Sequence, residues 1–112
     1  MMRAVLQRIC VVVAVMGGWH VVSAQSPQSI EITKLSFLPA EITIHVGDTV
    51  EWINKDPIAH TATAKPDEPG GAWEVMIPVG KSAQYQPTQA ATIAYYCRFH
   101  PNMKGQIIVL PK

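Results

Sequence analysis

Three residues with metal-binding side chains follow one another at equal spacing near the end of the sequence. In the stretch YYCRFHPNMKG, Cys97, His100 and Met103 are each three residues apart, and Pro101 lies between the last two. A tight loop can turn side chains at this spacing toward one centre, and a proline reduces the entropy lost in ordering the loop. We interpret the thiol, the imidazole and the thioether as ligands of one metal ion.

A fourth ligand has to come from another part of the chain, and His60 in the segment DPIAHTATA is our candidate. It begins a predicted strand after a proline-containing loop, and in a sandwich two such loops can meet at one end. Two histidines, a cysteine and a weak axial methionine form the ligand set of type 1 (blue) copper sites that transfer electrons. Structural zinc sites use cysteine, histidine and carboxylate ligands, so the thioether argues against zinc.

Each of these residues also has an ordinary interpretation as part of a core or a surface. We expect His45, on the outward face of a strand, to be a surface residue, and Met76 to be core and not a ligand. Cys97 paired with His100 would suit a cysteine-dependent enzyme, but such thiols need an exposed, base-paired position. We therefore predict that the protein is not an enzyme. A copper carrier or delivery protein with the same ligands, and a metal-free adhesion module, remain as alternatives.

The N-terminal segment differs from the rest of the chain and predicts export. Arg3 and Arg8 flank a start that leads into the apolar block ICVVVAVMGGW, which is too short to span a membrane, and a cleavage site follows it. We interpret residues 1–24 as a signal peptide for the periplasm, the alternative being an uncleaved membrane anchor, and residues 25–112 as one domain. Cleavage after Ala24 would remove Cys10, which leaves Cys97 without an intramolecular disulfide partner.

The charge of the predicted mature chain is close to balanced. The whole sequence carries nine basic and eight acidic side chains, and two of the basic ones lie in the predicted signal peptide. This balance gives no indication of a nucleic-acid partner. After signal cleavage we expect no membrane span.

Apolar and polar residues alternate with a period of two along much of residues 29–110, which predicts half-buried strands. In EITIHV, residues 41–46, the isoleucines and the valine share one face, and Gly47-Asp48 supplies a turn toward residues 49–54, so we expect a hairpin. The pattern predicts an all-β Greek-key sandwich of about seven to eight strands. The polar stretch AKPDEPGG, residues 64–71, predicts an exposed loop. Alternation in ATIAYYC places Ile93, Tyr95 and Cys97 on the inward face.

The pattern Cys-x-x-His-Pro-x-Met at residues 97–103, with Lys104-Gly105 after it, resembles the cupredoxins, and its short loop resembles the amicyanins among them. The segment PIAHTATA is similar to the family's first-histidine segment, and the resemblance extends over residues 29–110. It implies a cupredoxin-like sandwich with one type 1 copper ion that cycles between Cu(I) and Cu(II). It also implies a monomer that shuttles electrons in the periplasm between transient redox partners. A dehydrogenase and a c-type cytochrome are guesses at the level of the family.

Two positions depart from the family pattern. Thr61 stands where relatives usually have an asparagine that ties the two ligand loops together, so the rigidity of these loops is a question for the structure. Phe99 stands where amicyanins usually have proline, and its backbone N–H could donate to the sulfur of Cys97. Such a hydrogen bond would favour Cu(I).

Overall fold

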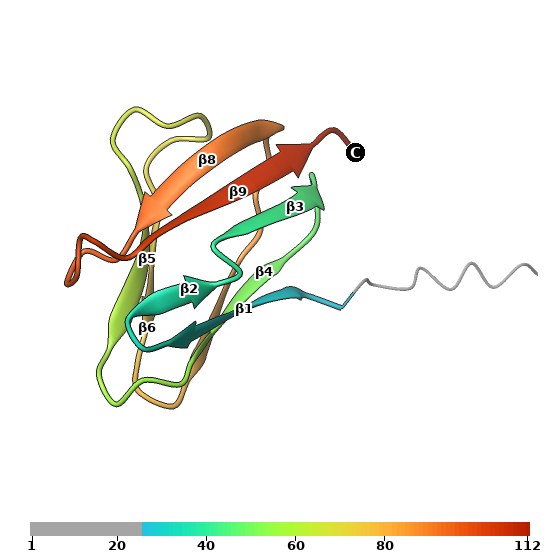
Figure 1. The fold of residues 1–112 in the computed structure, drawn as a ribbon. Coiled ribbons are helices and arrows are strands. Elements are labelled where there is room, and N and C mark those ends of the chain that lie inside the picture. The colour runs from blue at the N-terminus through green and yellow to red at the C-terminus, as the bar shows by residue number, and fades with distance from the viewer. Residues whose placement is uncertain (1–25) are drawn as a thin grey trace, which may run out of the picture.

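A computed structural model describes residues 26–112, so the predicted signal peptide at residues 1–24 lies outside the described residues. No helix long and apolar enough to cross a membrane occurs in this part of the chain. The described residues form nine strands (Figure 1), which are β1 (Gln28–Thr33), β2 (Ser36–Leu38), β3 (Glu41–His45), β4 (Val50–Asn54), β5 (His60–Ala64), β6 (Glu74–Ile77), β7 (Ser82–Tyr85), β8 (Ala91–Tyr96) and β9 (Lys104–Leu110).

The strands form two sheets that pack as a sandwich (Figure 1). One sheet has the order β2-β1-β4-β7 and the other has the order β3-β9-β8-β5-β6. The pairs β1–β4 and β3–β9 are parallel, and the remaining neighbours are antiparallel. The prediction of an all-β sandwich is confirmed. The strand number is higher than we expected because the segment 29–37 is not one strand: a turn at Lys34-Leu35, both with positive φ, divides it into β1 and β2.

The predicted hairpin of residues 41–46 with residues 49–54 is wrong. β3 pairs with β9 in the five-stranded sheet, whereas β4 pairs with β1 and β7 in the other sheet. The turn at Gly47, with a φ of 97°, therefore carries the chain from one sheet to the other. Alternation predicts which side chains face the core but not which strand each one pairs with, so both arrangements are compatible with the sequence.

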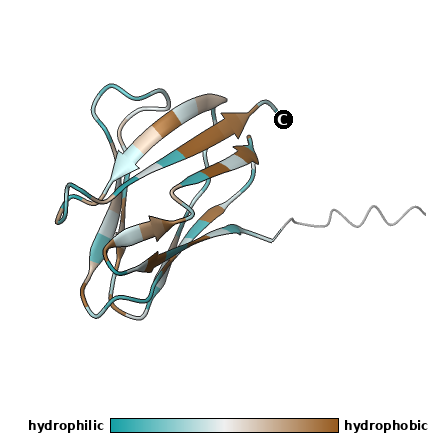
Figure 2. Cartoon of the chain, viewed as in Figure 1, coloured by the Kyte–Doolittle hydropathy of each residue, from teal (hydrophilic) through white to brown (hydrophobic). Residues whose placement is uncertain are grey.

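The core lies between the sheets and consists of the side chains that alternation turns inward, and apolar and polar residues alternate along the strands (Figure 2). Ile93, Tyr95 and Cys97 are all buried, as predicted. The loop after β5 that contains residues 65–71 is largely exposed, also as predicted. Met76 is not a core residue as we expected, because it lies on the outward face of β6 and is 47% exposed.

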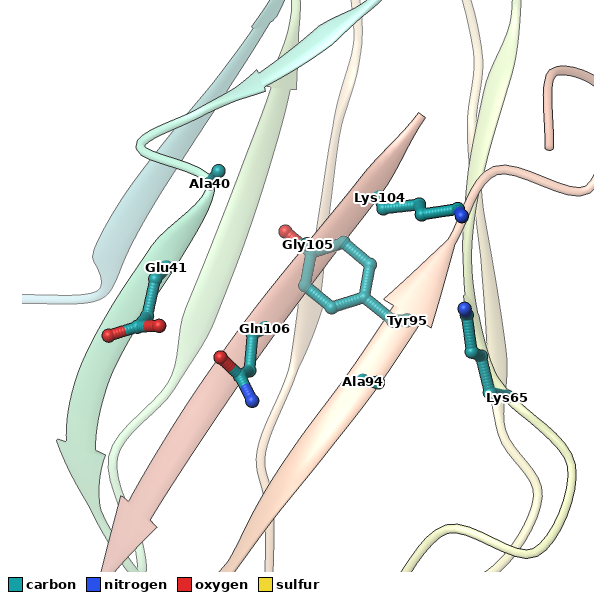
Figure 3. Close-up of a pocket in the computed structure, with 8 residues that line it drawn as sticks. All are labelled: Ala40, Glu41, Lys65, Ala94, Tyr95, Lys104, Gly105 and Gln106. Carbon is teal, nitrogen blue, oxygen red and sulfur yellow. The ribbon is translucent and has the colours of Figure 1, made fainter. Parts of the chain in front are cut away.

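The hydroxyl end of Tyr95 packs against the backbone of its cross-strand partner. Tyr95 on β8 is fully buried and lies opposite Gly105 on β9, and Figure 3 shows its ring lying across β9 at that residue. A Cβ atom at Gly105 would overlap the ring of Tyr95. Trp52 Nε1 donates a hydrogen bond to the Tyr95 hydroxyl at 3.3 Å, which fixes the ring from the other sheet. Gly105 is therefore required by the packing of the core.

We predict that Gly105→Ala destabilises the fold by about 1–3 kcal/mol or more, because the buried ring of Tyr95 has no room to move away. The measurement is the free energy of unfolding in urea. In a Tyr95→Leu background the added methyl group should cost less than it does in the wild type. An equal cost in both backgrounds would contradict the packing explanation.

Candidate metal centre

Three of the four predicted ligands converge at one end of the sandwich. Cys97 Sγ lies 3.7 Å from His60 Nδ1 and 3.8 Å from His100 Nδ1. The three donor atoms lie within 4.8 Å of one another, which makes them a group that could hold a metal ion. His60 begins β5, and Cys97 directly follows β8, its neighbour in the sheet. The two imidazole rings meet edge to face at 60°, with their centroids 5.2 Å apart.

The donors differ in their access to solvent. His60 and Cys97 are both fully buried, and Met103 is 3% exposed and belongs to the core cluster. His100 is partly exposed. The site therefore has a closed inner side at His60 and an open outer side at His100.

Backbone hydrogen bonds fix the loop of residues 97–103. The N–H of Cys97 donates to the carbonyl of Met103 at 3.0 Å, and the N–H of Met103 donates to the carbonyl of His100 at 2.8 Å. The first bond closes the base of the loop, and the second forms a tight turn with Pro101 inside it. The loop thus holds its curled shape through its own backbone.

His60 is oriented by a carboxylate that we did not single out in the sequence. Its Nε2 lies 2.8 Å from Asp56 Oδ2, which leaves Nδ1 facing Cys97. Burial alone would raise the pKa of Asp56. Hydrogen bonds from the Leu35 N–H, from the His60 ring and from the Lys34 N–H outweigh burial and hold this pKa below its usual value.

A second residue missed in the sequence, Asn54, fixes the segment that leads to His60. Its buried amide donates to the carbonyl of Ile58 at 2.8 Å and to that of Ile77 at 3.1 Å, while its oxygen accepts from the Asp56 N–H at 2.9 Å. Polar residues at the end of a strand are common, so the residue types of Asn54 and Asp56 did not by themselves indicate a role at the site. The available signal for Asp56 was its position four residues before His60.

Thr61 connects the two segments that carry the ligands. Its N–H lies 3.4 Å from Cys97 Sγ, and its side-chain oxygen accepts a hydrogen bond from the Arg98 N–H at 2.8 Å. A threonine therefore joins the two ligand loops, at the position where the resemblance in the sequence led us to expect asparagine. Within residues 26–112, the backbone N–H within hydrogen-bonding distance of this sulfur belongs to Thr61, and the hydrogen bond we expected from Phe99 is not formed.

The hydrogen bonds of Thr61 continue to the surface and return to the loop. Its hydroxyl lies 2.9 Å from that of Thr63, which donates to Glu74 Oε1 at 2.7 Å. Glu74 also accepts from Arg98 Nε at 2.8 Å, and the Arg98 guanidinium lies 5.0 Å from the ring centroid of Phe99. A closed ring of contacts thus connects β5 and β6 with the start of the ligand loop.

Apolar side chains surround the open side of the site. A shallow hollow at His100 is lined by Leu35, Phe99, His100, Pro101, Asn102 and Met103. Phe99 is 44% exposed and Leu35 is 48% exposed, and Ile58, 40% exposed, lies on the loop before His60. Leu35 belongs to the β1–β2 turn, so a segment distant in sequence from the ligand loop contributes to this surface.

Comparison with protein families identifies the class of protein to which the chain belongs. The sequence profile of the cupredoxin-like domain matches residues 7–109. The chain therefore belongs to the cupredoxin-like family, as the resemblance in its sequence implied.

Individual relatives include amicyanins. The amicyanin of Paracoccus denitrificans is 32% identical over 83 residues, which cover 71% of this chain and 63% of that protein, so the chain spans just under two thirds of its length. Amicyanin-alpha of Methylorubrum extorquens is 31% identical over 83 residues, which cover 71% of this chain and 69% of that protein. The structure of a reduced Cu(I) form at pH 4 of an amicyanin variant has a TM-score of 0.71 and 29% identity, covering 78% of this chain and 85% of that one.

We predict that Thr61→Val destabilises the metal-depleted protein by about 1–3 kcal/mol, because the Arg98 N–H loses its acceptor in a partly buried contact and the side chain of Thr61 is itself fully buried. Valine keeps the shape of threonine, so lost packing does not explain a loss of stability. The measurement is the free energy of unfolding in urea. The matched control is Thr63→Val, which removes a more exposed hydroxyl and should change stability by about 0.5 kcal/mol or less. Equal effects of the two substitutions would contradict the role of Thr61.

The Glu74–Arg98 ion pair predicts a pH dependence of stability. The hydrogen bond from Arg98 is the largest cause that lowers the pKa of Glu74, so the folded-state pKa lies below the unfolded one. The contribution of the pair is therefore fully present above the unfolded pKa and is lost as the pH falls through the folded pKa. Both side chains are exposed, so we expect a difference of about 0.2–1 kcal/mol between wild type and Glu74→Gln near neutral pH. Unfolding curves at several pH values should show this difference disappear in acid, and a difference that persists there would rule out the pair as its source.

Proposed function

We propose that the protein is a periplasmic type 1 copper protein that carries single electrons between redox partners, with His60, Cys97, His100 and Met103 as the ligands. The observation that carries this proposal is the convergence of Cys97 Sγ with the Nδ1 atoms of both histidines. Copper, when bound, supplies a one-electron couple between Cu(I) and Cu(II).

The chemistry of these donors fits copper. The thiolate and the thioether suit Cu(I), and the two imidazoles suit both oxidation states. The thioether of Met103 makes a poor zinc ligand. A hydrogen-bond donor to the cysteine sulfur is one way in which a protein tunes such a site, and the Thr61 N–H occupies this position.

The rigidity of the site suits electron transfer. The ligand loop is closed by backbone hydrogen bonds, His60 is held by Asp56, and Thr61 ties the two segments together. A set of donors that is held in place by the fold needs little rearrangement when the charge of the metal changes. This property supports electron transfer over copper delivery, which requires ligands that release the metal readily.

We assign the exchange of electrons to the face around His100. Its ring is the partly exposed donor, and Leu35, Phe99 and Pro101 surround it. A small apolar surface suits a weak and transient contact with a redox protein. A dehydrogenase as donor and a c-type cytochrome as acceptor are the partners that we propose from the family.

Addition of Cu(II) to the metal-depleted protein tests the proposal. We expect an intense blue colour, measured as absorption in the visible range, because the thiolate of Cys97 donates charge to the metal. Cys97→Ser should abolish the colour, while His45→Gln, which changes a histidine on the outward face of β3, should keep it. A colourless complex of the wild type would contradict a type 1 site.

Metal exchange in the same sample separates the electron carrier from the alternative of a copper delivery protein. The buried positions of His60 and Cys97 predict slow loss of copper to an excess of chelator. Loss of copper within the time of mixing would favour delivery.

A further inference from the structure

The carboxylate of Asp56 contacts the predicted ligand His60 at Nε2, the ring nitrogen that does not face Cys97. Asp56 is 8% exposed, and Oδ2 accepts from His60 Nε2 at 2.8 Å and from the Leu35 N–H at 3.0 Å. Oδ1 accepts from the Lys34 N–H at 2.7 Å. A buried carboxylate is stable only when such hydrogen bonds replace water, so this one is held in a single position.

We propose that Asp56 is a positioning residue that acts through His60 to favour the oxidised, more highly charged state of the metal centre. The proposal rests on the proposed function, because it concerns the balance between Cu(I) and Cu(II).

The geometry supports this role in two ways. Donation from Nε2 to the carboxylate fixes the tautomer of His60, so that Nδ1 is the nitrogen with a free lone pair, and it is Nδ1 that faces Cys97 at 3.7 Å. The carboxylate also makes the imidazole a stronger donor and places a negative charge near the site. Both effects stabilise Cu(II) more than Cu(I).

A competing explanation is that Asp56 only stabilises the β1–β2 turn. Lys34 and Leu35 have φ values of 49° and 58°, which are unfavourable for residues with a side chain, and both of their N–H groups donate to this carboxylate. Substitution of Asp56 could therefore act through the turn. The experiment has to separate the two roles.

The first measurement is the reduction potential of copper-loaded Asp56→Asn. We expect the affinity for Cu(II) to fall about tenfold relative to that for Cu(I), which corresponds to a rise of about 59 mV for a one-electron couple. The blue absorption should remain, because Cys97 and the other ligands are kept. An unchanged potential in a blue, folded variant would overturn the proposal.

The control places the same substitution in a chain whose turn does not need Asp56. Lys34→Asn with Leu35→Gly gives the residues that prefer a two-residue turn with positive φ at both positions. In this background Asp56→Asn should raise the potential by the same amount as in the wild type. Disappearance of the shift would mean that the effect came from the turn, and the proposal would fail.

A readout without copper distinguishes failure of this inference from failure of the proposed function. Nitrogen NMR of the metal-depleted protein should show the His60 ring with its proton on Nε2. Asp56→Ala, made together with Lys34→Asn and Leu35→Gly, should lose this preference. An unchanged tautomer in that variant would count against the inference. The wild type could show this tautomer, and the Asp56→Ala variant could lose it, while the wild type gives a colourless Cu(II) complex. That combination would refute the proposed function and leave the positioning role of Asp56 intact.

Discussion

The antiparallel pairing of β5 with β8 is the constraint on which the candidate metal centre depends. Their backbone ladder pairs Ala64 with Tyr95 and Thr63 with Tyr96, and then it ends. Beyond this point the side chain of Thr61 replaces the ladder, because its oxygen accepts the N–H of Arg98 and its own N–H points to Cys97 Sγ. The strands are thus held together where backbone pairing has stopped, and the gap that opens between them is where His60 and Cys97 face each other.

Much of this arrangement follows from local sequence patterns. Alternation predicted the inward face that ends at Cys97, and the equal spacing of Cys97, His100 and Met103 predicted a compact loop. The closed loop base agrees with this expectation. Pairing between distant strands was harder to predict, because alternation is the same whichever partner a strand has. For this reason β3 and β4 were wrongly joined as a hairpin, although each one lies in a different sheet.

The residues behind the predicted ligands were missed for a related reason. Asp56 and Asn54 are polar residues of kinds that often lie at strand ends and in turns, and their importance comes from partners far along the chain. Asp56 accepts from the backbone of the β1–β2 turn, and Asn54 donates to residues near β6. Met76 shows the opposite error, because we expected it in the core once Met103 supplied the axial thioether, and instead it lies on the outward face of β6.

The hydrogen bond from the Cys97 N–H to the Met103 carbonyl also has a consequence for how such proteins can diversify. It closes the ligand loop at its base, so residues 99–102, which lie beyond the contacts of Arg98 with β5 and β6, are connected to the sandwich mainly through the ends of the loop. Surface loops tolerate changes of length and sequence better than the strands that support them. Descendants of this chain could therefore acquire loops of other lengths, with different properties at the metal, while inheriting the two sheets unchanged.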